Sequence, residues 1–486
     1  MFTAELSFLF ITLVLGYILL TDLHGGTSFE VSLIKALLLR GVALATFAAL
    51  HSLAIQCPGL LGEQGLHPIQ PTLKLIYKFV HDKEVLPWWS SDRAMKILLS
   101  LVHDKFFVKE HITIHLINVM RVDMALAALA VIFPHPILLI YLYISYYAAK
   151  RVSGPFLNFQ WDALLLEALL LSVPLSLAYN SLLTKLSLWL FKVLLFRLMW
   201  GSGLVKLYGR DNAWHTDYSA MTYHFLTQPL PSLLGMYLHT HLPYEALRAF
   251  TFLAIVTEVH LPLLSLVNNM HVNAVVCLGY VALQIAIAVA GYYGFFNYLT
   301  IALSVALLRD SQVLYVLQRV GVPATLLASM QEVVYATPSA LAPPSSLLHM
   351  LVSYVSAGVV VGVAVLVTVS NGMALVSLLV RCHLVEEYAP SHTHTTTPST
   401  SIATPPSVDI MHDSSGFVDR YISRCYGGLQ DVYVYLLRVF FLGNHYGLFA
   451  HMTKQRDEVC IQLSTDLATW HDVSFKYKPE DIHIPP

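Results

Sequence analysis

The sequence predicts an all-α polytopic membrane helical bundle that is followed by a small C-terminal β segment. Two observations support this fold class. Hydrophobic residues make up 56% of the 486 residues and charged residues only 12%, which is about half the charged fraction of an average globular protein. Apolar runs long enough to cross a bilayer recur up to residue 380. Such runs must be helical because every backbone donor needs a partner within its own segment.

Charge and cysteine usage narrow the classes of function. The formal net charge is −2, so no overall field attracts nucleic acid, and we expect no nucleic-acid partner. We expect the cysteines to be small buried thiols, although four of them could pair in an oxidising lumen. No CxxC pair occurs among the five, which are Cys57, Cys277, Cys382, Cys425 and Cys460.

The N-terminal part of the chain predicts two membrane helices, a turn and a surface region. Residues 1–30 hold a short apolar run without a basic flank, which favours a signal anchor or first membrane helix. Residues 31–55 predict a spanning helix. Glycines recur at every third position within 59–68, which suits a tight turn rather than a span. Residues 69–116 mix basic residues with apolar ones at helical spacing and favour amphipathic helices on the membrane surface.

A multi-span helical domain is predicted for 31–380. About nine or ten apolar segments precede residue 380 in all. Residues 118–149 predict two spans or a hairpin, broken at Pro134. A weak amphipathic connector is expected over 309–345. The remaining predicted spans cover 162–180, 183–205, 246–268, 272–291, 295–308 and 346–380.

The segment 183–205 carries cations where most membrane segments carry none. Lys192 and Arg197 lie in its middle, where a charge must meet water, a carboxylate or carbonyl groups. Lys185 and Lys206, at its two ends, could instead extend their ammonium groups to the interface. The nearest acids in the sequence that could serve as partners are Asp162, Glu167 and Glu258.

A polar loop is predicted at 209–231, directly after the charged segment. Asp217, Tyr223 and His224 lie together there and could do acid–base chemistry, but a hydrogen-bonded cluster that fixes the loop is the favoured interpretation. The sequence holds no nucleophile elbow, zinc-protease, phosphate-loop, dinucleotide or zinc-ligand motif. We therefore expect no catalytic residue, no cofactor and no metal.

The composition changes after residue 380. Residues 381–415 are rich in Pro, Ser and Thr and predict a flexible linker. Within 416–486, apolar residues first recur every three or four positions, which predicts an amphipathic helix. They then alternate with polar residues around Ile461 and again around Phe475, which predicts two antiparallel strands. Two strands alone are marginal in water, so the tail reads as the beginning of an incomplete β domain.

Several blocks in order resemble the lipase maturation factors. These blocks are FQWDALLLEALLL (159–171), FRLMWGSGLVKLYGRDNAW (196–214), MTYHFLTQPLP (221–231) and NHYGLFAHMTKQRDEV (444–459). The glycine-rich turn at 59–68 is also similar to a broader set that includes the vitamin K-dependent gamma-glutamyl carboxylases. The match covers most of 31–481, with the linker as an insertion.

The resemblance implies a non-enzymatic, multi-pass membrane protein of the endoplasmic reticulum. Such proteins assist the folding and assembly of secreted lipases, so the expected partners are a client lipase or another secreted protein, and membrane lipid. The C-terminal β domain is then luminal, and the oligomeric state stays open. The residues that match the family pattern, with mostly structural roles, are Gln160, Trp161, Asp162, Glu167, Arg197, Gly201, Gly203, Lys206, Asp211, Trp214, Tyr223, His224, Thr227, Gln228, Pro229, Pro231, Asn444, Tyr446, Gly447, Thr453, Arg456 and Glu458.

Two departures from the family pattern stand out, and two other classes of function stay open. Phe225 and Leu226 occupy the place of a Tyr–Glu pair that family members usually have. Family members also continue beyond the point where this chain ends, so we expect either a truncated sequence or a homologue that has lost part of its luminal domain. The alternatives are a membrane-embedded enzyme related to the carboxylase set and, more weakly, a transporter.

Overall fold

A computed structural model describes residues 32–73, 112–178, 181–209, 211–229, 232–291, 293–323, 325, 327–328, 354, 357–362, 441–444, 446–457 and 459–474. Some predictions lie wholly or mostly outside these ranges. They are the segment 1–30, most of the surface region 69–116, most of the predicted span 346–380, the linker 381–415 and the amphipathic helix that begins the tail.

The described part of the chain is helical almost throughout, as predicted. Its elements are α2 (Ser32–Leu61), α5 (Ile112–Ile132), α6 (Pro136–Val152), the 3-10 helix η2 (Gly154–Leu157), α7 (Gln160–Leu177), α8 (Ser181–Tyr208), α9 (Asn212–His215), α10 (Ala220–Thr227), α11 (Leu233–His241), α12 (Tyr244–Ile255), the π-helix η3 (Val256–His260), α13 (Leu261–Ser265), α14 (Met270–Ala290), α15 (Phe296–Ser304), the 3-10 helix η4 (Val305–Leu307), α16 (Asp310–Arg319), β1 (Gln462–Leu463) and β2 (His471–Asp472).

Several of these helices can cross a membrane. Within the described ranges, Ser32–Leu61, Gln160–Leu177, Tyr244–Ser265 and Met270–Ala290 are long and apolar enough to do so. The pair Phe296–Leu307 and Asp310–Arg319, which meet at 114°, adds a fifth span if it is counted as one. The predicted polytopic helical membrane protein is therefore confirmed.

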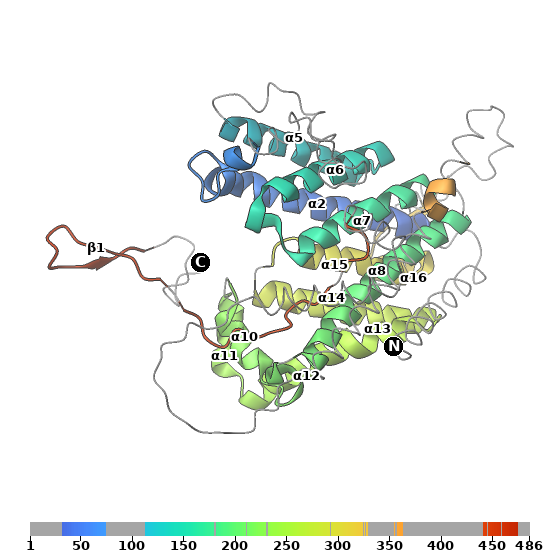
Figure 1. The fold of residues 1–486 in the computed structure, drawn as a ribbon. Helices are drawn as coiled ribbons and strands as arrows, with labels where there is room; N and C mark the ends of the chain where they lie inside the picture. The colour runs from blue at the N-terminus through green and yellow to red at the C-terminus, as the bar shows by residue number, and fades with distance from the viewer. Residues whose placement is uncertain are drawn as a thin grey trace, which may run out of the picture.

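Successive long helices run up and down the bundle, and contacts at both ends show this. At one end, the Glu63 amide after α2 donates to Thr113 near the start of α5 at 2.9 Å. At the other end, the Lys35 ammonium near the start of α2 donates to the Ala178 carbonyl after α7 at 2.6 Å. The first end, where α2, α6, α8 and α14 finish, is called the tail end below. Figure 1 shows β1, α10 and α11 at this end and α16 at the opposite one.

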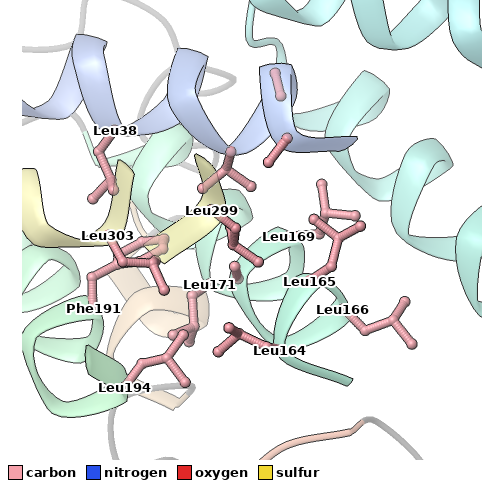
Figure 2. Packing of buried hydrophobic residues seen from close by; sticks show 14 of the residues in the cluster. Leu38, Leu164, Leu165, Leu166, Leu169, Leu171, Phe191, Leu194, Leu299 and Leu303 are labelled. Carbon is pink, nitrogen blue, oxygen red and sulfur yellow. The ribbon is translucent and has the colours of Figure 1, made fainter. Parts of the chain in front are cut away.

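The apolar core lies where α2, α7, α8 and α15 meet. Figure 2 shows Leu164, Leu165 and Leu166 of α7 pointing in different directions, and all three are fully buried. A helix that is buried all round lies at the centre of its bundle. In lipid, such packing is held by van der Waals contact rather than by exclusion of water. Asp162, Glu167 and Ser172 of α7 therefore lie inside protein.

Pro134 separates α5 from α6, which confirms the predicted break. The glycine-rich stretch forms a turn over residues 62–67, with the Gly65 amide donating to the Gly62 carbonyl at 2.9 Å. Helix α2 nevertheless continues to Leu61, so the prediction of a turn is wrong for Gly59, which is helical.

Cys57 and Cys277 are buried free thiols as expected, whereas Cys460 is a free thiol that is exposed.

Two predictions about the polar regions need correction or refinement. The segment 209–231 is largely helical rather than a loop, because α9 and α10 occupy much of it. Two antiparallel strands form, with Gln462 opposite Asp472 and Leu463 opposite His471. The first lies where it was predicted, around Ile461, whereas the second lies at His471–Asp472, ahead of the predicted position around Phe475, which is outside the described residues. Both strands are only two residues long, and the hairpin extends away from the bundle (Figure 1).

Candidate functional site

Residues 441–456, called the tail segment below, lie along the polar positions of the membrane bundle. They follow α7 and α8 towards the tail end and then pass along the segment 209–231. In chain order, the tail segment donates hydrogen bonds from Gly443 to Glu167, from Gly447 to Gln160, from Leu448 to Ser202, from Met452 to Asp211 and from Arg456 to Gln228. The predicted motif blocks, which are far apart in the sequence, therefore meet in one place.

Glu167 of α7 is the centre of this contact. Its carboxylate forms a buried ion pair with Arg197 of α8, and the exposed fractions of the two residues are 0% and 2%. The same carboxylate accepts from the Gly443 amide and the Asn444 side chain, each at 3.1 Å, and from the Tyr446 hydroxyl at 2.7 Å. A buried charge is tolerated when it is paired and hydrogen-bonded in this way. The tail segment supplies three of the four donors.

Tyr446 closes the site around this pair. Its ring lies 5.3 Å from the Arg197 guanidinium carbon, in a cation–π arrangement. Burial, followed by the negative charge of Glu167, raises the pKa of the Tyr446 hydroxyl well above its usual value. The hydroxyl thus remains protonated and keeps donating to the carboxylate.

A second buried ion pair joins Lys206 of α8 to Glu258 of the π-helix η3. The Lys206 ammonium also lies 5.0 Å from the centroid of Trp214 and 5.9 Å from that of Phe449. Gly203 lets the backbone of α8 lie close to that of η3, because a Cβ at this position would lie 2.7 Å from the Glu258 carbonyl oxygen. The second pair therefore fixes α8 against η3, and Phe449 of the tail segment covers it.

Two of the three acids predicted as partners of the charged helix form ion pairs with it. Glu167 pairs with Arg197 and Glu258 pairs with Lys206, whereas Asp162 has other partners. Asp162 accepts from the Tyr146 hydroxyl at 2.7 Å and from the Phe159 amide at 3.0 Å. The expectation that Asp162 serves the charged helix is wrong, because this carboxylate caps the beginning of its own helix.

Next to it, Trp161 of α7 stacks on Phe159, with ring centroids 4.5 Å apart. Gln160, at the start of the same helix, is exposed but accepts from the Gly447 amide at 2.9 Å. The beginning of α7 therefore contributes both a capped helix end and a hydrogen bond to the tail segment.

Two residues of the segment 209–231 fix the tail segment at the bundle end. Asp211 accepts from the Ala213 amide at 3.1 Å, which caps α9, and from the Met452 amide at 2.6 Å. The Gln228 side chain donates to the Ala290 carbonyl at 2.7 Å, while its backbone carbonyl accepts from Arg456 at 3.1 Å. Arg456 also approaches the Pro229 carbonyl at 3.5 Å.

His224 lies among aromatic rings rather than among acids. Its ring is stacked with Tyr293, with centroids 6.3 Å apart and planes 8° apart, and meets Phe449 edge-on at 5.7 Å. Desolvation, followed by the charge of Lys206, lowers the pKa of His224 to about 4. Asp217 accepts from Ser219. Within the described residues, the expected hydrogen-bonded cluster of Asp217, Tyr223 and His224 does not form.

The remaining motif residues have simpler surroundings. Thr227 donates to the Tyr223 carbonyl at 3.0 Å, Gly201 and Trp214 are buried, and Thr453 is exposed. Pro231 and Glu458 lie outside the described residues. The motif set omitted Glu258 and Phe449, which both contact Lys206. An acid inside an apolar run was the signal for Glu258, whereas nothing in the local sequence marks Phe449.

The arrangement binds a segment of the chain itself. Across the described ranges, no group of three or more His, Cys, Asp and Glu residues could hold a metal ion. The carboxylates of Glu167 and Glu258 are each paired with a cation of the same protein. The fold and this site define a multi-pass helical membrane protein whose C-terminal segment docks on buried charges of its own bundle.

Comparison with known proteins identifies the class. A family model described as the lipase maturation factor transmembrane domain matches residues 33–315, and one described as the lipase maturation factor C-terminal domain matches residues 442–486. The chain belongs to the lipase maturation factor family. The carboxylase resemblance finds no support in these matches.

Individual relatives agree with this family. The chain is 32% identical to human lipase maturation factor 2 over 57% of its own length and 40% of that protein. It is 29% identical to the chicken (Gallus gallus) lipase maturation factor 2 over 93% of its length and 67% of that protein. It is 28% identical to mouse lipase maturation factor 1 over 60% of its length and 49% of that protein. The match thus spans less than half of the human and mouse relatives named here. No solved structure matches this chain.

Proposed function

We propose that this protein assists the folding and assembly of secreted lipases as a non-enzymatic maturation factor of the endoplasmic reticulum membrane. The family membership and the names of the relatives support this role. The observation that carries the proposal is the docking of the tail segment. It fixes the beginning of the C-terminal domain at one end of the membrane bundle.

The docked tail gives the hairpin a defined position beside the membrane. Arg456 is held on the bundle by the Gln228 carbonyl, and β1 begins six residues later at Gln462. Exposed apolar side chains follow on the hairpin, including Leu463, Leu467 and Trp470, which are 64%, 80% and 52% exposed. An apolar surface of this kind suits contact with a partly folded client that still exposes apolar residues of its own.

The buried charges support a holding role rather than a catalytic one. A catalytic acid or base needs access to substrate and a pKa near the working pH. Glu167, Arg197 and Lys206 are almost completely buried. His224 has its pKa lowered to about 4 by desolvation and by Lys206, so it is neutral at neutral pH and its ring serves for packing.

Rescue of lipase secretion tests the proposal. The full chain is expressed in cells that lack their own lipase maturation factors, and secreted lipase activity is divided by secreted lipase protein. We expect the wild-type chain to raise this ratio without changing an unrelated secreted enzyme. Tyr446→Phe should lower the rescue, whereas Tyr298→Phe, at a tyrosine that is 59% exposed, should leave it unchanged.

Two outcomes would contradict the proposal. If the wild-type chain leaves lipase activity per molecule unchanged, the role in lipase maturation is wrong for this protein. If Lys206→Met or His224→Phe abolishes the rescue while the amount of folded protein stays constant, the site acts chemically and the enzyme alternative replaces the holding role.

A further inference from the structure

Helix α11 (Leu233–His241) directly precedes one membrane span and contacts the end of another. Just before it, the Ser232 hydroxyl donates to the carbonyl of Ala290, the last residue of the span Met270–Ala290, at 2.7 Å. Just after it, the span Tyr244–Ser265 begins. Both ends of α11 are thus at the level where spans end. A nine-residue helix covers roughly 14 Å at 1.5 Å per residue, and here that length runs along the membrane boundary.

One face of α11 packs closely on the bundle. A Cβ added at Gly235 would lie 2.6 Å from the Ala290 carbonyl oxygen, so the backbone of α11 lies directly against the end of α14. Leu238 is partly buried against Phe225 and Leu247. This inward face fixes the rotation of α11 about its own axis, so the outward face is equally well defined.

The outward face of α11 is apolar and aromatic. Leu233, Leu234 and Tyr237 are 51%, 41% and 57% exposed, and they lie on one side of the helix because positions three and four apart are neighbours. Tyr237 stacks on His241 with ring centroids 4.1 Å apart. The apolar part of this face thus ends in an aromatic ring that carries a hydroxyl group.

This face continues the surface that the spans present to lipid. On α14, Ile285 and Val289 are 51% and 50% exposed, and on α12, Leu253 is 58% exposed. Apolar side chains that point outward from membrane spans face lipid. Ser232 contacts the backbone of Val289 directly at 2.9 Å, so the outward face of α11 begins where the lipid-facing side of α14 ends.

We propose that α11 is an interfacial helix that lies in the membrane plane at the tail end, with Leu233, Leu234 and Tyr237 embedded in lipid. The leucines reach the acyl chains and the Tyr237 hydroxyl lies at the headgroup level, where tyrosine is enriched in membrane proteins. The partner of this face is therefore a phospholipid layer and not a protein. Through Gln228 and Ser232, which both bond Ala290, the helix also sets the depth of the site that holds the tail segment.

Photo-crosslinking of the full chain tests this assignment. The photoreactive residue p-benzoylphenylalanine replaces Leu234 or Tyr237 in separate variants, which are reconstituted into phosphatidylcholine vesicles that contain a radiolabelled phosphatidylcholine. Position 289 is the lipid-facing control. Position 467, on the hairpin and 80% exposed, is the control in water. Size-exclusion elution before irradiation confirms that each variant is folded.

We expect lipid adducts at positions 234 and 237 within about twofold of position 289 and at least about tenfold above position 467. Yields as low as those at position 467 would overturn the proposal. The same variants are irradiated in cell membranes, where an adduct to a protein in place of lipid would show that this face binds a polypeptide, which also overturns it. Leu234→Lys should lower the yield at position 237 at least about threefold, because the cation lifts the helix out of the acyl region.

Discussion

Replacing Glu167 by Gln is the sharpest perturbation of the docking site. The change keeps the size of the side chain and removes its charge, so it leaves the Arg197 guanidinium buried without an anionic partner. Arg197 has few other contacts to rely on. Within the described part of the chain, its Nε and Nη1 atoms have no hydrogen-bond partner, and its remaining support is the Tyr446 ring at 5.3 Å.

The magnitudes of three variants follow from these contacts. Removing one partner of a buried ion pair costs about 3–5 kcal/mol, so we expect Glu167→Gln to lower the free energy of unfolding by this amount. Arg197→Met should cost less, about 2–3 kcal/mol, because the carboxylate keeps the donors of Gly443, Asn444 and Tyr446. Tyr446→Phe removes one hydrogen bond to a charged acceptor and should cost about 1.5–3 kcal/mol.

A double-mutant cycle shows whether these costs share one cause. The free energy of unfolding is measured by titration with sodium dodecyl sulfate in mixed micelles, for the wild type, Glu167→Gln, Arg197→Met and the double variant. Residues in direct contact couple by about 0.5–3 kcal/mol, and the double variant should be less destabilised than the sum of the single variants by about 2 kcal/mol or more. Additive costs, or a Glu167→Gln variant as stable as the wild type, would refute the reasoning.

Further predictions concern the second ion pair, the histidine and the end of the tail segment. Gly203→Ala should cost about 1–3 kcal/mol in the same titration, because its Cβ would lie 2.7 Å from a backbone oxygen; Gly59→Ala, in open space on α2, is the matched control and should be neutral or stabilising by up to about 1 kcal/mol. His224 binds a proton below about pH 6.5 in the unfolded chain but only below about pH 4 in the folded protein, so the free energy of unfolding should fall on acidification, by about 2 kcal/mol at pH 5. His224→Phe should remove this part of the pH dependence, and an unchanged slope of stability against pH would contradict the burial of the ring. Arg456→Ala should raise hydrogen exchange at tail amides such as Met452 several-fold, whereas Gln455→Ala, at an exposed neighbour, should not; equal exchange in the two variants would show that Arg456 does not hold the segment.

Local patterns predicted the four spans found in the described ranges, the break at Pro134 and the antiparallel pairing of two short strands, because each depends on neighbouring residues only. The need of Arg197 for a buried partner could also be predicted, since a cation inside an apolar run must be paired. Which of the three acids is that partner could not be predicted from the sequence. Asp162 has the same charge as Glu167, but it begins α7 and caps it, and only the packing of the helices shows which carboxylate faces α8.

The docking of the tail segment lay beyond local reasoning for a different reason. Glu167 and Tyr446 are 279 positions apart, so no periodicity connects them. The segment 209–231 was predicted as a loop because its polar residues and prolines resemble one. Asp211 before Ala213 is, however, a helix N-cap, and this signal would have located α9. Helix α10 has no comparable cap: its N-cap residue, Ser219, makes no side-chain capping bond.

The central claim is that the tail segment is held on the bundle by its own contacts, and cleavage of the chain tests this most directly. A specific protease site is placed within 389–415 of the full protein, which is then cleaved in detergent and purified by a tag at the N-terminus. We predict that the C-terminal fragment stays with the bundle through size-exclusion chromatography and that Glu167→Gln with Tyr446→Phe releases it. Release of the fragment from the cleaved wild-type protein would contradict the docking and the proposed function that rests on it.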